Sequence, residues 1–125
     1  MNKKISIKAF VDIFDELSSV ELQVKLWLNI ENDTGLISSF VELMNNIDSP
    51  DFSYVIDEIV QDSELKEELN ELLSMVGLYE EPKIYRKYKN DVYIVADPNW
   101  KKIRDFAKSI KVKYYDYLRR VEKNI

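Results

Sequence analysis

The most apolar stretch of the chain, residues 20–30, alternates between apolar and polar side chains. Every even position from Val20 to Ile30 is apolar, and among the odd positions only Trp27 is not polar. A period of two places six apolar side chains on one face of a β-strand, whereas in a helix they would spread over most of the circumference. Leu and Gln favour helix, but the alternation predicts a core strand over residues 20–31.

A second region, residues 83–96, predicts a β-hairpin. Two runs rich in aromatic and β-branched residues, 84–88 and 92–96, flank the short polar sequence Lys89-Asn90-Asp91. Such runs on either side of a short polar turn are typical of two paired antiparallel strands.

Elsewhere the apolar residues recur at helical spacing, every three or four positions. This pattern predicts helices over residues 6–17, 36–47, 50–60, 63–76 and 98–121. Residues 32–35 read as a turn, and the N-cap candidates are Ser6, Thr34, Ser49, Asp62 or Ser63, and Asp97. Pro50 and Pro98 suit the first turn of a helix, and Gly77 suits the position just after one. After Ser109 the last of these regions also alternates between apolar and polar residues, as a strand would. A break near Ser109 is therefore the alternative to one long helix.

These elements together predict a single α+β domain over residues 1–125. Two glycines and three prolines in 125 residues imply long elements, mainly helices. The domain is expected to be helix-dominated, with a small antiparallel sheet formed by the hairpin 83–96, which the strand at 20–31 can join.

The net charge of −5 conceals two halves of opposite sign. Residues 1–80 contain 17 acidic and 5 basic residues, a net of −12, whereas residues 81–125 contain 6 acidic and 13 basic residues, a net of +7. The acidic half, 1–80, and the basic half, 81–125, therefore either present two charged surfaces or pair with each other inside the fold.

The residue types that carry most enzyme chemistry are missing. The sequence has no histidine and no cysteine, which excludes a Ser-His-Asp triad, thiol chemistry, disulfides and the usual zinc sites. Its two glycines are far apart, so there is no phosphate-binding glycine loop. Neighbouring carboxylates could bind Mg²⁺ or act as acid and base, but a solvated helix face explains them more simply. We expect no catalytic residue, no metal, no cofactor and no enzymatic activity.

The acidic residues gather in the middle of the chain. Residues 31–81 hold 14 carboxylates and one cation, Lys66. A small protein with such a block can imitate a phosphate backbone and attract a basic partner by complementary potential. The candidate partner-binding residues are Asp57, Glu58, Asp62, Glu64, Glu67, Glu68 and Glu71.

The basic end of the chain suggests an alternative, a nucleic-acid-binding or regulatory module. Five tyrosines (Tyr85, Tyr88, Tyr114, Tyr115 and Tyr117) interleave with seven cations (Arg86, Lys87, Lys89, Lys111, Lys113, Arg119 and Arg120). Aromatic rings can stack on bases while cations contact phosphates. The same tyrosines could instead pack in the core, and an acidic chain with a pI near 4.8 repels phosphate. We therefore do not expect nucleic acid to be the partner.

In overall character the chain resembles bacterial immunity proteins of contact-dependent growth inhibition and other polymorphic toxin systems. The resemblance lies in the acidic run Asp57–Glu71 and the stretch Trp27–Glu42, in a small cysteine-free chain rich in Lys, Asn and Ile. It implies a cytoplasmic protein that binds and blocks one cognate toxin domain, often a nuclease, without catalytic residues of its own. No apolar segment reaches the roughly 20 residues of a membrane span, and no signal peptide follows the basic start, so we expect no membrane association. An adaptor without ligand chemistry is a further interpretation, and the oligomeric state stays open.

Overall fold

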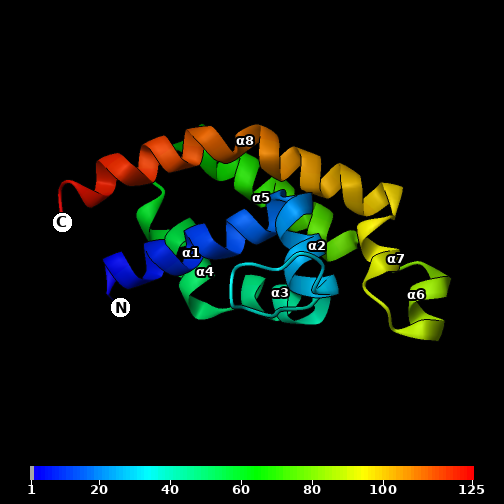
Figure 1. Cartoon of the computed structure of the whole chain (residues 1–125). Helices are drawn as coiled ribbons and strands as arrows, with labels where there is room; N and C mark the ends of the chain where they lie inside the picture. Colours follow the sequence, from blue (N-terminus) through cyan, green and yellow to red (C-terminus); the bar gives the residue numbers. More distant parts are fainter. Residues whose placement is uncertain (1) are drawn as a thin grey trace.

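The computed structural model describes residues 2–125 and builds this stretch of the chain from helices alone (Figure 1). No residue in that range lies in a β-strand, so the prediction of an α+β domain with a small antiparallel sheet is wrong. In chain order the segments are α1 (Lys3–Ser18), α2 (Val20–Leu28), α3 (Phe40–Ile47), α4 (Pro50–Tyr54), the π-helix η1 (Val55–Ile59), α5 (Ser63–Leu78), α6 (Lys83–Tyr88), α7 (Val92–Val95) and α8 (Pro98–Glu122).

Helix α1 forms the centre of the core, where it packs against α8, α4, α2, α3 and η1. Its Phe10 and Phe14 have no exposed surface, and burying each ring contributes roughly 2–3 kcal/mol. The Phe10 ring stacks on Phe52 of α4 with centroids 4.6 Å apart, and Phe14 lies 6.0 Å from Tyr114 of α8. Helices α1 and α8 run in opposite directions, so the start of α1 and the end of α8 lie at the same end of the molecule (Figure 1).

The predicted strand at 20–31 is instead helix α2 followed by a loop. Ser19 caps the helix by accepting a hydrogen bond from the Leu22 backbone N–H at 3.1 Å. The buried residues of α2, Gln23, Leu26 and Trp27, follow helical spacing. Gln23 decides the outcome: a strand would point this odd-numbered polar side chain away from the core, whereas the helix buries it completely.

The apolar even positions of that stretch do not share one buried face. Val20 is 44% exposed and Ile30 is 51% exposed. The alternation is therefore a coincidence of composition, and the helix propensity of Leu and Gln indicates the correct structure.

The predicted hairpin at 83–96 is also helical, as α6 and α7. Pro82 opens α6, where its carbonyl accepts the Arg86 N–H at 3.2 Å, and Lys89 ends it in the left-handed conformation with φ 55°. The two short helices each bury one large side chain, Tyr85 and Ile94. A hairpin would expose one face of both runs. The two short helices instead direct Tyr85 and Ile94 into the core.

The turn between α6 and α7 makes a contact that sequence spacing could not indicate. The carboxylate of Asp91 accepts a hydrogen bond from the Phe40 backbone N–H at 3.0 Å, which satisfies a free donor at the start of α3. Tyr85 meets the Phe40 ring edge-on at 5.7 Å. These two contacts tie the α6–α7 segment to α3, while α7 itself packs against α2, α6 and α8.

Several helix ends differ from the predictions. Helix α1 begins at Lys3 with Asn2 as its cap, and the proposed cap Ser6 lies buried inside it. Helix α3 begins only at Phe40, capped by Ser39 rather than Thr34, because residues 29–39 form a loop. Gly77 lies within α5 instead of following it.

The helices predicted over 63–76 and 98–121 are confirmed, and the one predicted over 50–60 is α4 continued by the π-helix η1. Asp97 caps α8 and Pro98 occupies its first turn. This helix continues unbroken to Glu122, so the alternative break near Ser109 is wrong. Within residues 2–125, none of the helices is both long enough and apolar enough to cross a membrane.

Candidate acidic partner-binding surface

The first two candidate carboxylates lie on a turn of π-helix. Helix α4 starts with Ser49 as its cap and Pro50 in its first turn, and then widens into η1, where the Val60 N–H bonds the Val55 carbonyl at 2.9 Å. This bond spans five residues rather than four, which is rare and occurs often at functional sites. Asp57 and Glu58 are the two exposed residues of the turn.

Asp62 links this turn to α5. Its carboxylate accepts the backbone N–H groups of Glu64 at 3.0 Å and Leu65 at 3.1 Å, so it serves as the N-cap of the helix. A negative charge at this position also interacts favourably with the helix dipole. The cap fixes where α5 begins, and therefore which of its residues face outward.

Helix α5 separates its apolar and acidic residues on different faces. Leu65, Leu69, Leu72 and Val76 are buried, at the spacing predicted from the sequence. The glutamates at positions 64, 67, 68 and 71 fall within about 100° of one another around the axis, at 100° per residue. Three of them are exposed, and Glu68, nearest the packed side, is half-buried.

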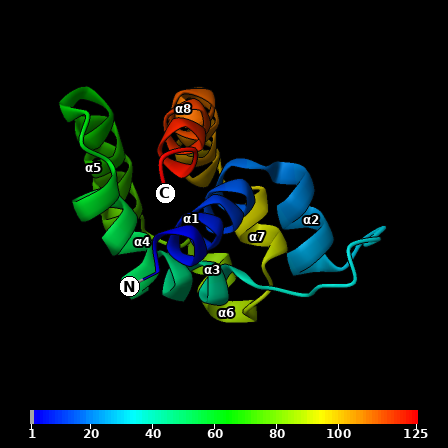
Figure 2. The ribbon, with the colours of Figure 1, turned by 90° about the vertical axis from the view of Figure 1, so that its left-hand side faces the viewer.

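Tyrosines of α8 anchor this region to the rest of the molecule. The hydroxyl of Tyr114 donates to the Leu65 carbonyl, and the Gln61 backbone N–H donates to the Tyr117 oxygen at 2.8 Å. Helix α5 lies beside α8 at the edge of the molecule, away from α2 and α7 (Figure 2). The acidic residues are thus held on a firm outer edge.

We call the seven residues from Asp57 to Glu71 named above the acidic surface, and its charges are mostly unpaired. Glu68 accepts from the Lys113 ammonium at 2.9 Å, and this pair is the one ion pair that the acidic surface makes among residues 2–125. The hydrogen bond to Glu68, together with the nearby charges of Glu68 and Glu64, raises the pKa of Lys113. Lys66 points elsewhere, donating to the backbone carbonyl of Asp57 at 3.1 Å. Of the seven carboxylates, therefore, one forms an ion pair with the basic half of the chain, residues 81–125.

The acidic surface is not arranged as a metal site. Within residues 2–125, no group of three or more carboxylates is placed to hold a metal ion. The carboxylates instead spread along η1, the loop after it and the first two turns or so of α5.

The tyrosines of the nucleic-acid hypothesis are largely committed to packing. Tyr85 and Tyr114 are buried, and the hydroxyls of Tyr115 and Tyr117 bond the backbone or Asp15. Tyr88, at 58% exposed, is the one of the five whose ring is open to solvent. Among the seven cations, Arg86, Lys111, Lys113 and Arg119 lie in ion pairs. This arrangement favours the core-packing interpretation of the tyrosines.

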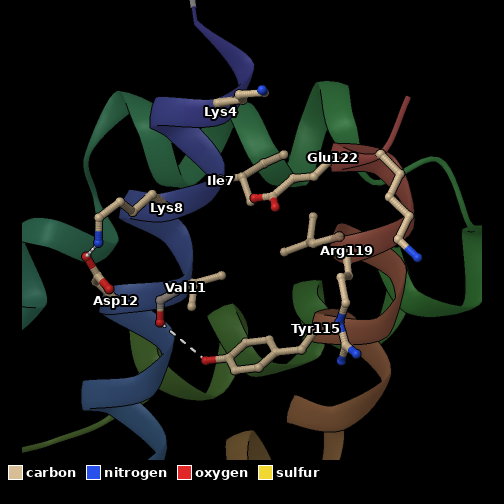
Figure 3. A pocket seen from close by; sticks show the side chains of 10 residues that line it. Lys4, Ile7, Lys8, Val11, Asp12, Tyr115, Arg119 and Glu122 are labelled. Carbon is tan, nitrogen blue, oxygen red and sulfur yellow. Dashed lines mark hydrogen bonds and ion pairs between the residues drawn. The ribbon is translucent and has the colours of Figure 1, made fainter. Parts of the chain in front are cut away.

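A feature that the sequence did not indicate is a groove between α1 and the last turns of α8 (Figure 3). Its volume is about 740 Å³. Ile7 and Val11 come from one helix and Tyr115 and Leu118 from the other. Because the two walls are more than 100 residues apart in the chain, no local sequence pattern could have predicted the groove.

Comparison with known proteins supplies no relative. No protein-family model matches the chain, and neither a curated protein nor a solved structure matches it. The resemblance to immunity proteins therefore rests on the character of the sequence alone.

Proposed function

We propose that this protein is a stoichiometric inhibitor, an immunity protein that binds and blocks a cognate basic toxin domain, and that the toxin is a nuclease. The observation that carries the proposal is the acidic surface: six of its seven carboxylates make no ion pair among residues 2–125. Such an inhibitor acts from the cytoplasm, where an incoming toxin reaches its target, and needs no cofactor.

A nuclease holds the phosphate backbone of its substrate with lysines and arginines in its active site. The carboxylates of α5 and η1 can pair with these cations in place of the phosphates. Complementary potential accelerates the encounter, and pairs that become desolvated in the complex slow dissociation. A rigid helix suits this role, because it presents its charges without an ordering cost on binding.

Charge reversal on the acidic surface tests the proposal. The triple variant Glu64→Lys, Glu67→Lys and Glu71→Lys leaves the Glu68–Lys113 pair in place. The control reverses Glu21, Glu31 and Glu80, which are exposed, lie outside the acidic surface and make no ion pair in the described chain. Both variants change the net charge equally, so a difference between them reports the position of the charges.

The partner to use is the C-terminal toxin domain of the large secreted protein that we expect to be encoded next to this chain. Binding by calorimetry and inhibition of nucleic-acid cleavage are both measured. We expect the acidic-surface variant to bind at least 100-fold more weakly, or about 2.7 kcal/mol, and the control to bind nearly as the parent does. Equal affinities for the two variants would reject this surface, and an absence of any complex would reject the function.

A further inference from the structure

The groove between α1 and α8 is open along its length and is closed at one end. At the closed end Tyr115 reaches across from α8 and donates to the Val11 carbonyl at 3.3 Å (Figure 3). Ile7 and Leu118 form a floor that is almost fully buried. The groove is thus a trough with an apolar floor that opens towards the start of α1 and the end of α8.

The walls of the groove are regular helix and have equal length. The lining residues run from Lys4 to Asp12 on α1 and from Tyr115 on α8 to Lys123, the residue just after that helix, eight residue steps on each side. At 1.5 Å per residue each wall is about 12 Å long, or just over two turns. A trough between two helices with these dimensions matches two to three turns of a third helix, which would place apolar anchors at positions i, i+3 or i+4, and i+7 on the floor.

The charges at the rim specify which helix fits. The lining residues include four cations and two anions, within a chain whose net charge is −5. Lys8 is paired with Asp12 at 3.1 Å and Arg119 with Asp116 at 2.9 Å. The remaining cations, Lys4 and Lys123, are exposed and make no ion pair among residues 2–125, whereas Glu122 is the one unpaired anion of the lining. The rim therefore favours carboxylates over cations on an occupant.

The floor argues against nucleic acid as the occupant. Stacking on bases needs an aromatic face open to solvent. The groove's aromatic residue, Tyr115, has the Lys111 ammonium 5.4 Å from its ring centre and the Phe14 ring in a T-shaped contact with centroids 6.2 Å apart. Aliphatic side chains suit this floor better than bases do.

We propose that this groove binds an amphipathic helix of a partner protein, with aliphatic residues on the floor and carboxylates reaching Lys4 and Lys123. The groove lies on the α1 side of α8 and the helix α5 part of the acidic surface on its other side, while Glu58 lines a neighbouring pocket with Lys3, Tyr117 and Asn124. An acidic partner is repelled by α5 and attracted at the groove, so the asymmetry of the chain also orients the encounter. This inference does not depend on the toxin-inhibitor proposal.

The test uses the full chain and a labelled synthetic helical peptide with leucines along one face and glutamates on both flanks. Binding is followed by fluorescence anisotropy at low salt, where exposed charges act most strongly. Because the groove is small, we expect a weak complex. The variant Lys4→Glu with Lys123→Glu should reduce the affinity at least tenfold, whereas Lys4→Arg with Lys123→Arg should retain it.

Two controls separate position from net charge. Lys102→Glu with Lys108→Glu changes two exposed cations of α8 outside the groove and should leave binding unchanged. A peptide with lysines in place of the glutamates, which the acidic surface can attract, should leave the NMR signals of the groove residues unchanged. NMR shift changes on adding the acidic peptide should centre on Ile7, Val11 and Leu118.

Three results would overturn the proposal. They are equal binding by the Lys4→Glu, Lys123→Glu variant and the parent, shift changes confined to other helices, and preferential binding of a single-stranded oligonucleotide over the acidic peptide. The triple reversal on α5 should not weaken peptide binding, so failure here and failure of the inhibitor proposal are distinguishable.

Discussion

The indole N–H of Trp100 donates a 3.1 Å hydrogen bond to the side-chain oxygen of Gln23, joining two residues 77 positions apart in the chain. The same oxygen accepts from the Arg104 guanidinium at 3.0 Å, while the amide nitrogen of Gln23 donates to the carbonyls of Glu16 and Leu17, each at 3.0 Å. One fully buried amide thus connects α1, α2 and α8.

Replacing Gln23 with Leu should destabilise the protein by about 3 kcal/mol, because it leaves buried donors and acceptors without partners. The loss should appear as a lower free energy of unfolding in urea. Gln61→Leu is the control: its exposed amide donates to the Glu58 carbonyl at 2.7 Å, where water can replace it, so stability should change by less than about 1 kcal/mol. A Gln23→Leu variant as stable as this control would show that the network contributes little.

Substitutions at Asp62 should separate capping from partner binding. Asp62→Ala removes the acceptor for two backbone N–H groups and should cost about 1 kcal/mol of folding stability. Asp62→Asn keeps a good cap and removes the charge, so it should nearly preserve the melting temperature while weakening toxin binding. Equal stability of the two variants would contradict the capping role.

The buried phenols should make the fold sensitive to alkali. Burial, reinforced by the hydrogen bond to Asp15, raises the pKa of Tyr115 above its usual range, and burial also raises the pKa of Tyr79 and Tyr114. The unfolded chain then releases these protons at a lower pH than the folded protein does. Stability is fully present below the ordinary phenol pKa of 10.0 and falls as pH rises beyond it.

Urea unfolding between neutral pH and pH 11 or so measures this effect. Tyr115→Phe should be less stable at neutral pH, since it loses the bond to Asp15, and should lose stability less steeply above pH 10. The exposed Tyr88→Phe should follow the parent at every pH. A parallel pH profile for Tyr115→Phe would mean that this phenol does not contribute.

Asp91 should make the free energy of unfolding depend on pH in the acid range. Burial raises its pKa above 3.8, although the bond from the Phe40 N–H opposes the shift. Its contribution is therefore most favourable below the ordinary pKa and diminishes as pH rises through the raised value. Asp91→Asn retains an acceptor without a charge, and should flatten this region of the stability profile and be at least as stable as the parent at neutral pH.

The matched variant is Asp91→Ala, which leaves the Phe40 N–H without its acceptor. It should be less stable than Asp91→Asn at every pH, as measured by urea unfolding. If the alanine variant were the more stable of the two, the bond to α3 would have no stabilising role.

The sequence predicted the helices whose apolar stripes are long and capped, and failed where the segments are short. In α5 and α8, apolar residues at spacings of three and four, with Asp62 and Asp97 at the starts, identify both the helix and its buried face. In α2 a fortuitous period of two outweighed the one informative residue, Gln23, whose burial depends on partners in other helices. The short helices α6 and α7 depend on the burial of Tyr85 and Ile94 against other helices, which local propensity does not describe.

The acidic surface followed from the sequence for the same reason that α5 did. Once its helical phase was known, the outward direction of Glu64, Glu67 and Glu71 was fixed. The pairing of Glu68 with Lys113 was not accessible, because it depends on how α8 lies against α5. The π-helical turn at Asp57 and Glu58 was equally hidden, since it differs from α-helix by one hydrogen-bond step.

The π-turn makes the direction of the acidic surface sensitive to chain length. Wide turns of this kind behave as one residue added to an ordinary helix, and a single residue corresponds to a rotation of about 100°. Deleting one residue between Val55 and Ile59 would tighten the turn and swing the segment leading into α5 around its axis. Because Val60 and Leu65 on that segment are buried, the same rotation would also move them out of the core, so the π-turn sets the direction of the acidic surface and its packing together.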